Sequence, residues 1–155
     1  MTDFFLKQKI MEITDKKTEG NKAFEFENEN RLRVRLAGYL NRVQKDHDFV
    51  FRFDLAGLFT DDKQRQNLIR YWNHESIGFP DLQIISENRV CFIELKRGGI
   101  SPNTLIRPTD IHGKNQLAMI HKLRGFGFSA GFGIGFEHSR AQILTFLRGG
   151  KIEIL

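Results

Sequence analysis

The chain has 155 residues, of which 40% are hydrophobic and 12% aromatic, enough to build the core of one domain. Its 24 basic and 19 acidic residues give a net charge of +5, which suits a polyanionic partner without singling one out. The single cysteine, Cys91, excludes an intrachain disulfide and a cysteine-based zinc site. No apolar run reaches the roughly 18 residues that span a bilayer, and the N-terminus lacks the order of a signal peptide. We therefore expect one cytoplasmic domain (1–155) with no membrane partner.

The first half of the chain contains one strong helical pattern. Leu32, Leu36, Leu40 and Val43 recur at spacings of four, four and three, which predicts one face of a helix from about residue 28 to residue 45. Weaker patterns predict a short helix at 1–13 and a loop at 14–22 within an N-terminal extension (1–22), then a strand at 49–53, a loop at 60–67 and a short strand at 69–72.

The second half is dominated by a predicted hairpin. Residues 82–85 and 90–95 are rich in β-branched and apolar side chains, and the stretch 86–89 between them suits a tight turn. Next we expect a loop at 98–113, a helix at 114–124 stopped by Gly125 and Gly127, a strand at 129–136, a helix at 141–147 and a strand at 151–155. This order predicts an α/β fold with a mixed central sheet flanked by helices.

Three charged residues interrupt the apolar hairpin. Glu94 and Lys96 are two residues apart in a strand and therefore share a face, while Ile93 and Leu95 point the other way. The hairpin brings Asp81 back beside Glu94. Two neighbouring carboxylates repel each other unless a cation lies between them, and Mg²⁺ prefers such oxygen ligands. A metal there would activate water for phosphodiester hydrolysis, and Lys96 would orient the water or neutralise developing charge.

The opposing interpretation is structural: Asp81 is a solvated turn residue, and Glu94 and Lys96 form an exposed ion pair on a strand. An isolated Glu-x-Lys pattern is weak evidence for a site. Here, however, Pro80-Asp81, twelve intervening residues and Glu94-Leu95-Lys96 together resemble the PD-(D/E)xK nuclease motif. The stretches GFPDL and FIELKRGG, followed by a polar loop and a helix with Gln116, are similar to its VRR-NUC branch over residues 28–136.

The resemblance implies a restriction-endonuclease-like catalytic core (28–136) that uses Mg²⁺ or Mn²⁺ to cleave DNA. It also implies branched DNA such as four-way junctions as substrate, similarity to Holliday junction resolvases, and a homodimer. Asp81, Glu94 and the Leu95 carbonyl would bind the metal, with Lys96 assisting the water. The longer loop at 98–113 departs from the family pattern, which leaves the roles of loop residues open.

Two further roles follow from the resemblance. The family has an acidic residue on its first core helix, and Glu29 is the candidate, because it lies three and seven positions before Leu32 and Leu36; Glu25 and Glu27 are competitors. The family's helix glutamine corresponds to Gln116, on the inward face of its predicted helix, where it would orient water or phosphate or simply hydrogen-bond a strand end.

Positive charge gathers after the motif. Residues 97–124 contain five basic residues and one acidic residue, a local net charge of +4. Phosphate contacts need positive charge without base-specific readout, so the candidate DNA-binding residues are Arg97, Arg107, Lys114 and Lys122. His112 and His121 are nine positions apart and would not share one helical turn, which disfavours a histidine-metal site.

Three hypotheses remain. The first is a metal-dependent, structure-selective DNA endonuclease. The second is a DNA-binding protein that keeps the nuclease fold without cleaving, which the acidic pair disfavours, because carboxylates near phosphate weaken binding. The third is a sequence-specific, restriction-type nuclease, for which 155 residues leave little room for a target-recognition domain.

Overall fold

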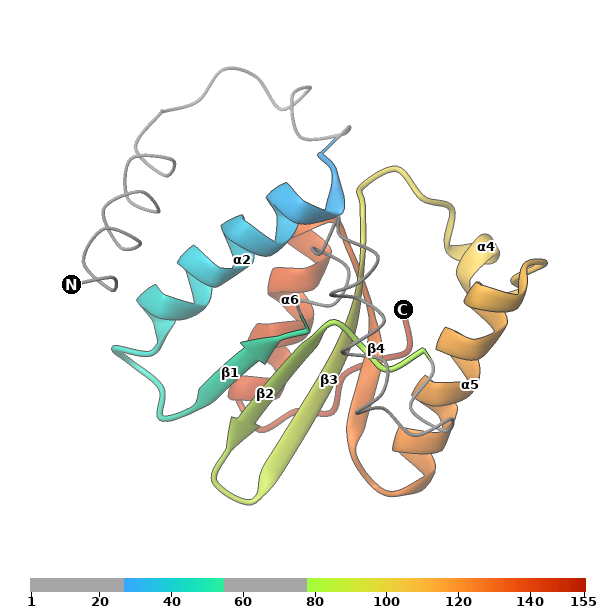
Figure 1. Ribbon diagram of the computed structural model, residues 1–155. Helices are drawn as coiled ribbons and strands as arrows, with labels where there is room; N and C mark the ends of the chain where they lie inside the picture. Colours follow the sequence, from blue (N-terminus) through green and yellow to red (C-terminus); the bar gives the residue numbers. More distant parts are fainter. Residues whose placement is uncertain (1–26, 55–77) are drawn as a thin grey trace, which may run out of the picture.

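The computed structural model describes residues 27–54 and 78–155, which form a mixed sheet with helices on both faces (Figure 1). The predicted helix at 1–13, the loops at 14–22 and 60–67 and the strand at 69–72 lie outside these ranges. The described elements are, in order, α2 (Glu29–Val43), β1 (Val50–Phe53), β2 (Leu82–Ser86), β3 (Arg89–Lys96), α4 (Pro102–Ile106), α5 (Ile111–Gly125), β4 (Ser129–Ile134) and α6 (Gly135–Leu147).

The sheet has four strands in the order β1-β2-β3-β4. The first two pairs are antiparallel and the β3-β4 pair is parallel, which makes the sheet mixed, as predicted. β2 and β3 form the predicted hairpin, with Ser86 opposite Arg89 and Leu82 opposite Ile93. The crossover from β3 to the parallel β4 runs through α4 and α5, because a parallel connection needs a dozen or more residues.

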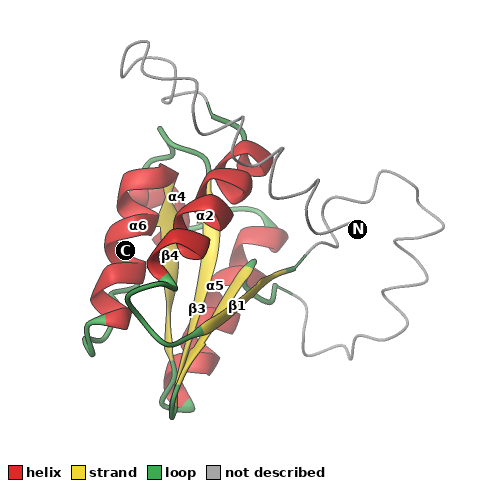
Figure 2. Ribbon diagram, turned by 90° about the vertical axis from the view of Figure 1, so that its left-hand side faces the viewer, coloured by secondary structure: helices red, strands yellow, loops and turns green. Residues whose placement is uncertain are grey.

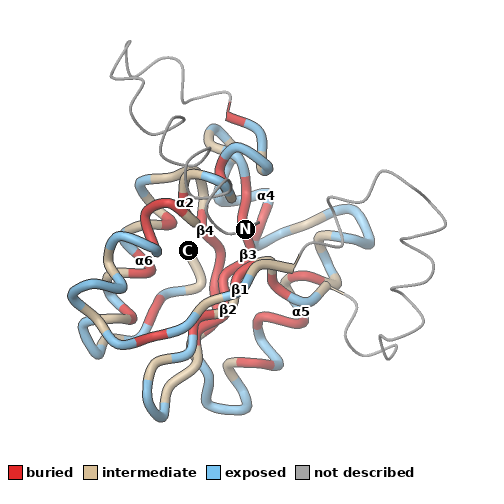
Figure 3. The backbone as a smooth tube through the Cα atoms, turned by 60° about the vertical axis from the view of Figure 1, so that its left-hand side comes forward, coloured by how far each residue is buried: buried red, intermediate tan, exposed pale blue. Residues whose placement is uncertain are grey.

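Alternation along β3 divides the core into two layers. Cys91, Ile93 and Leu95 face a cluster that includes residues of α2 and α6, whereas Phe92 joins a second cluster with residues of α5. Figures 1 and 2 show α2 and α6 near each other and α5 across the sheet. The longest runs of buried residues lie in β3 and β4, between these layers (Figure 3). Glu94 and Lys96 share the α5 side with Phe92.

α2 begins where the leucine pattern predicts. Asn28 is its N-cap: the Asn28 side chain accepts a hydrogen bond from the Arg31 N–H at 2.9 Å, which satisfies one of the unpaired donors of the first turn. Leu32, Leu36 and Leu40 are fully buried. None of the helices in the described ranges combines the length and apolar character needed to cross a bilayer.

The predicted loop at 98–113 is wrong in part, because it contains α4 and the first turn of α5. Pro102 favours a loop in the sequence, but it occupies the first turn of α4, where its missing N–H costs nothing. α5 begins at Ile111 instead of residue 114, since the Asp110 side chain caps it by accepting from the Gly113 N–H at 2.7 Å.

The C-terminal predictions also need correction. β4 ends at Ile134 instead of residue 136, and α6 begins at Gly135 instead of residue 141. Residues 151–155 form no regular strand, although the Phe132 N–H donates to the Ile154 carbonyl at 2.8 Å. The Ile152 side chain is fully buried, so the apolar alternation there reflects packing of an irregular segment rather than a strand.

Candidate active site

Asp81 stands immediately before β2, opposite Glu94 in the continued register of the hairpin. Its Oδ2 accepts a hydrogen bond from the Leu95 N–H at 3.0 Å. Its main-chain carbonyl accepts from the Asp54 N–H at 2.7 Å. Asp81 is therefore fixed at the end of the ladder and is not a solvated turn residue; its side chain is 16% exposed.

Glu94, Lys96 and Gln116 form a buried polar cluster between β3 and α5. Lys96 Nζ donates to Glu94 Oε1 and to Gln116 Oε1, each at 2.9 Å, and Gln116 Nε2 donates to Glu94 Oε1. The three residues are only 3%, 9% and 6% exposed. The alternative of an exposed ion pair on a strand face is thus wrong, because α5 covers this face and supplies a third polar partner.

The electrostatics of the cluster centre on Glu94. Burial raises the pKa of its carboxyl group from 4.5 to about 8, and the neighbouring Asp81 carboxylate contributes to the same rise. Lys96 acts in the opposite direction, by charge and by its hydrogen bond, and the Glu29 carboxylate adds a smaller upward effect. Glu29 therefore lies within electrostatic reach of Glu94.

The structure adds an arginine that the sequence analysis missed. Arg33, on α2, donates from Nη2 to Asp81 Oδ1 at 2.7 Å, and its side chain is 12% exposed. Arg33 follows Glu29 by four residues and so shares its helical face, which was the available signal. The competitor Glu27 is buried and paired with Arg35 at 2.8 Å, while Glu25 lies outside the described residues.

Close backbone packing positions the segment that carries Asp81. Gly78 adopts a φ of +81°, and a Cβ atom there would lie 2.7 Å from the carbonyl carbon and oxygen of Asn115 and 2.8 Å from the Gln116 nitrogen. Only glycine permits both the conformation and the approach. The segment before Asp81 is therefore seated directly on α5 at Gln116, which links the two sides of the site.

The donor set fits a hard divalent cation in part. The Asp81 carboxylate raises the cost of ionising Glu94, which a cation between the two side chains would relieve. In a regular antiparallel ladder the Leu95 carbonyl would face Pro80, which is opposite it in the continued register and has no N–H to donate. Within the described ranges no group of three or more His, Cys, Asp or Glu side chains is placed to hold a metal ion.

The candidate DNA-binding residues do not form one group. Arg97, just after β3, Arg107, at the end of α4, and Lys114, in the first turn of α5, are all exposed around the crossover. Lys122 is exposed near the other end of α5, eight residues and therefore roughly 12 Å along the helix from Lys114. Figure 1 shows α5 running from its start beside α4 to its end near the turn into β4.

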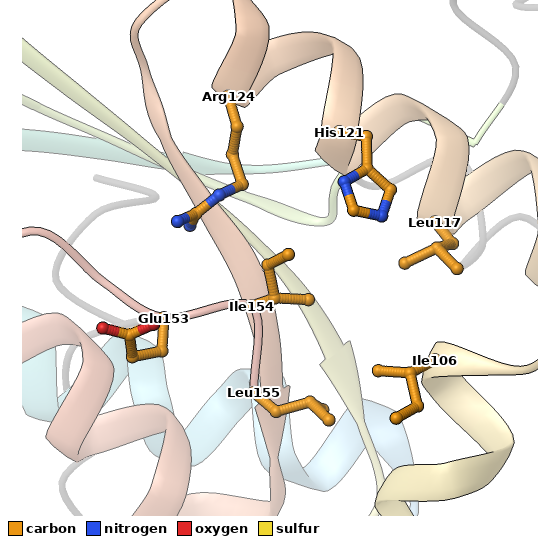
Figure 4. A pocket seen from close by; sticks show the side chains of 7 residues that line it. All are labelled: Ile106, Leu117, His121, Arg124, Glu153, Ile154 and Leu155. Carbon is orange, nitrogen blue, oxygen red and sulfur yellow. The ribbon is translucent and has the colours of Figure 1, made fainter.

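The two histidines also lie apart. His112 Nε2 is 2.9 Å from Gln116 Nε2, so His112 borders the cluster, a contact that the sequence analysis missed. His121 instead lines a pocket of about 400 Å³ between α4, α5 and the C-terminal segment (Figure 4). The other residues lining this pocket are Ile106, Leu117, Arg124, Glu153, Ile154 and Leu155, none of which belongs to the predicted site.

Comparison of the chain with protein-family models, with curated proteins and with solved structures gave no match.

Proposed function

We propose that this protein is a metal-dependent endonuclease that hydrolyses DNA phosphodiester bonds and that residues 28–136 form a restriction-endonuclease-like catalytic core. The observation that carries the proposal is that Asp81 lies beside the buried Glu94-Lys96-Gln116 cluster and accepts a hydrogen bond from the backbone between Glu94 and Lys96. Burying two carboxylates and an ammonium is costly, and perturbed ionisable groups of this kind gather at functional sites. A solely structural role would be served better by apolar side chains.

Each residue has a definite part in the proposed reaction. Asp81, Glu94 and the Leu95 carbonyl would hold Mg²⁺ or Mn²⁺, with Glu29 acting directly or through water. A metal held there would supply Lewis-acid polarisation of a phosphoryl oxygen and a lowered pKa of bound water. Lys96 places an ammonium beside Glu94, where it can orient the attacking water and neutralise charge on the phosphoryl group. Gln116 holds Lys96 and Glu94 in their mutual geometry.

The preferred substrate is branched DNA, in particular a four-way junction, and the preferred assembly is a homodimer. Both follow from the resemblance of GFPDL and FIELKRGG to VRR-NUC nucleases. Around the crossover, the exposed side chains of Arg97, Arg107 and Lys114 supply contacts to the DNA phosphate backbone, which do not depend on the base sequence. Lys122 would contribute to a longer DNA path along α5.

The test is cleavage of labelled four-way junction, flap, linear duplex and single-stranded DNA with Mg²⁺, Mn²⁺ or EDTA. Wild type is compared with Asp81→Ala, Lys96→Ala and the exposed control Lys45→Ala. We expect metal-dependent cutting that is fastest on the junction, is lost in the two site variants and persists in the control. Binding without cutting would favour the non-cleaving DNA-binding protein, and cutting at one base sequence regardless of branching would favour a restriction-type nuclease.

A further inference from the structure

Arg33 meets the candidate site from the face opposite α5. It projects from α2 to Asp81, whereas Lys96 and Gln116 reach Glu94 from β3 and α5. The Nη2–Oδ1 distance of 2.7 Å is typical of a charge-assisted hydrogen bond. The site therefore contains two cations, one on each carboxylate, of which the proposed mechanism uses only Lys96.

The guanidinium group of Arg33 is only partly satisfied. Nη2 donates to Asp81 and Nη1 donates to Asn30 Oδ1 at 3.0 Å, while Nε is buried and has no hydrogen-bond partner in the described part of the chain. Nε–H and one Nη2 N–H form one edge of the planar fork, which matches two oxygens of a single anion. Asp81 does not fill that edge, because Nε has no hydrogen-bond partner among the described residues and Asp81 Oδ2 accepts from the Leu95 N–H.

A metal would compete with Arg33 for the Asp81 carboxylate. Oδ2 accepts from the Leu95 backbone and Oδ1 accepts from Arg33, so a metal that binds Asp81 must compete with one of these two donors. A divalent cation on Oδ1 would repel the guanidinium and take its anionic partner. A phosphate bound to that cation would bring two non-bridging oxygens to the same place, which can satisfy both Nε and Nη2.

We propose that Arg33 is a phosphate-binding catalytic residue: it neutralises Asp81 in the empty site and transfers to the scissile phosphate of DNA when metal and substrate bind. The inference rests on the proposed nuclease function and identifies the ligand of Arg33 as a phosphodiester. No covalent step involves Arg33, which contributes only charge and hydrogen bonds to the phosphoryl oxygens as negative charge develops on them.

The experiment measures two quantities for wild type, Arg33→Ala, Arg33→Lys and Arg31→Ala. The first is the single-turnover cleavage rate at saturating Mg²⁺ on the DNA that wild type cuts fastest; the second is Mn²⁺ affinity of the DNA-free protein by calorimetry. Arg31 is the matched control, an exposed arginine on the same helix. Thermal melting confirms that each variant is folded.

We expect Arg33→Ala to slow cleavage by about 10²- to 10³-fold, the effect of removing one charge-stabilising donor. Arg33→Lys loses at least about tenfold, because an ammonium cannot bind two oxygens through a planar fork. Arg31→Ala changes the rate less than about threefold, since the charge it removes is exposed. Mn²⁺ affinity of Arg33→Ala stays at least as high as that of wild type, because a competitor for Asp81 is gone.

Each other outcome overturns the inference at a different point. If wild type cuts and Arg33→Ala matches Arg31→Ala, Arg33 is not catalytic, while the nuclease function stands. If Arg33→Ala loses Mn²⁺ affinity and cleavage by the same factor, Arg33 only positions Asp81. If Arg33→Ala does not fold, the test uses Arg33→Lys: full activity of this variant would show that the two-oxygen contact of the guanidinium with phosphate is not needed. If wild type cuts no DNA with either metal, the proposed function fails and this inference fails with it.

Discussion

Ionisation of the Glu94 carboxyl group is energetically unfavourable at its position in the fold. Its carboxyl group is almost fully buried and stands near a second carboxylate, Asp81, so its pKa rises to about 8 despite the hydrogen bond from Lys96. Such a group binds a metal only after losing its proton. The residue is thus suited to couple metal binding to proton release near neutral pH.

This shift predicts a pH-dependent stability of the metal-free protein. The pKa of Glu94 is higher in the folded state, about 8, than the ordinary 4.5, so the folded state holds more protons between these values. The stabilising contribution is complete below pH 4.5 and is lost as pH rises toward 8. Urea unfolding in EDTA at pH 5, 6.5 and 8 should show the free energy of unfolding of wild type falling relative to that of Glu94→Gln. Parallel curves for the two proteins would contradict the assignment.

The residues of the site differ in how far the sequence could predict them. Asp81, Glu94 and Lys96 follow from hairpin geometry, because strand alternation and a short turn fix which side chains meet. Arg33 and His112 do not, since their contacts depend on how α2 and α5 dock on the sheet. The burial of Lys96 could not be predicted from the sequence either, because a polar strand face indicates solvent exposure unless a helix covers that face.

At the scale of elements, the site depends on how the segment before β2 is seated on α5. Gly78 contacts the backbone at Asn115 and Gln116, so one close approach sets both the position of Asp81 and that of the Gln116 helix turn. The predicted elements with strong periodicity, α2 and the β2-β3 hairpin, were found. The short α4 was missed because a helix of five residues carries too little pattern to outweigh its proline.

Gly78→Ala is expected to lower the free energy of unfolding by about 1 to 3 kcal/mol, since it combines a positive φ with a backbone clash. Gly125→Ala is the matched control: no atom lies within 4 Å of its added Cβ, and it ends α5. We expect its stability to be unchanged or to rise by up to about 1 kcal/mol. Urea unfolding of both variants measures the difference, and equal effects would refute the packing argument.

At the scale of the whole molecule, the last residues join the two halves of the core. Arg124 Nη1, from α5, donates to the carbonyls of Ala130 and Ile152, each at 2.9 Å. Gln142 Nε2, from α6, donates to the Glu153 carbonyl at 2.9 Å. The Ile152 side chain enters the layer between the sheet, α2 and α6, so the segment connects helices on both faces of the sheet.

Ile152→Ala is therefore expected to cost about 2 to 5 kcal/mol of unfolding free energy, as for other large-to-small changes in a core. Glu153→Ala, next to it with an exposed side chain, should change stability by less than about 0.5 kcal/mol. Chemical denaturation of the two variants tests this, and a cost below about 1 kcal/mol for Ile152→Ala would show that the segment contributes little to the core.

The proposed nuclease function requires that Asp81 and Glu94 share one divalent cation. The most direct measurement is calorimetric titration of Mn²⁺ into wild type and into Asp81→Asn at pH 8, where Glu94 can give up its proton. We predict one binding site per chain in wild type, with proton release, and at least a tenfold loss of affinity in Asp81→Asn. Absence of Mn²⁺ binding to wild type, or equal binding by the two proteins, would contradict the claim.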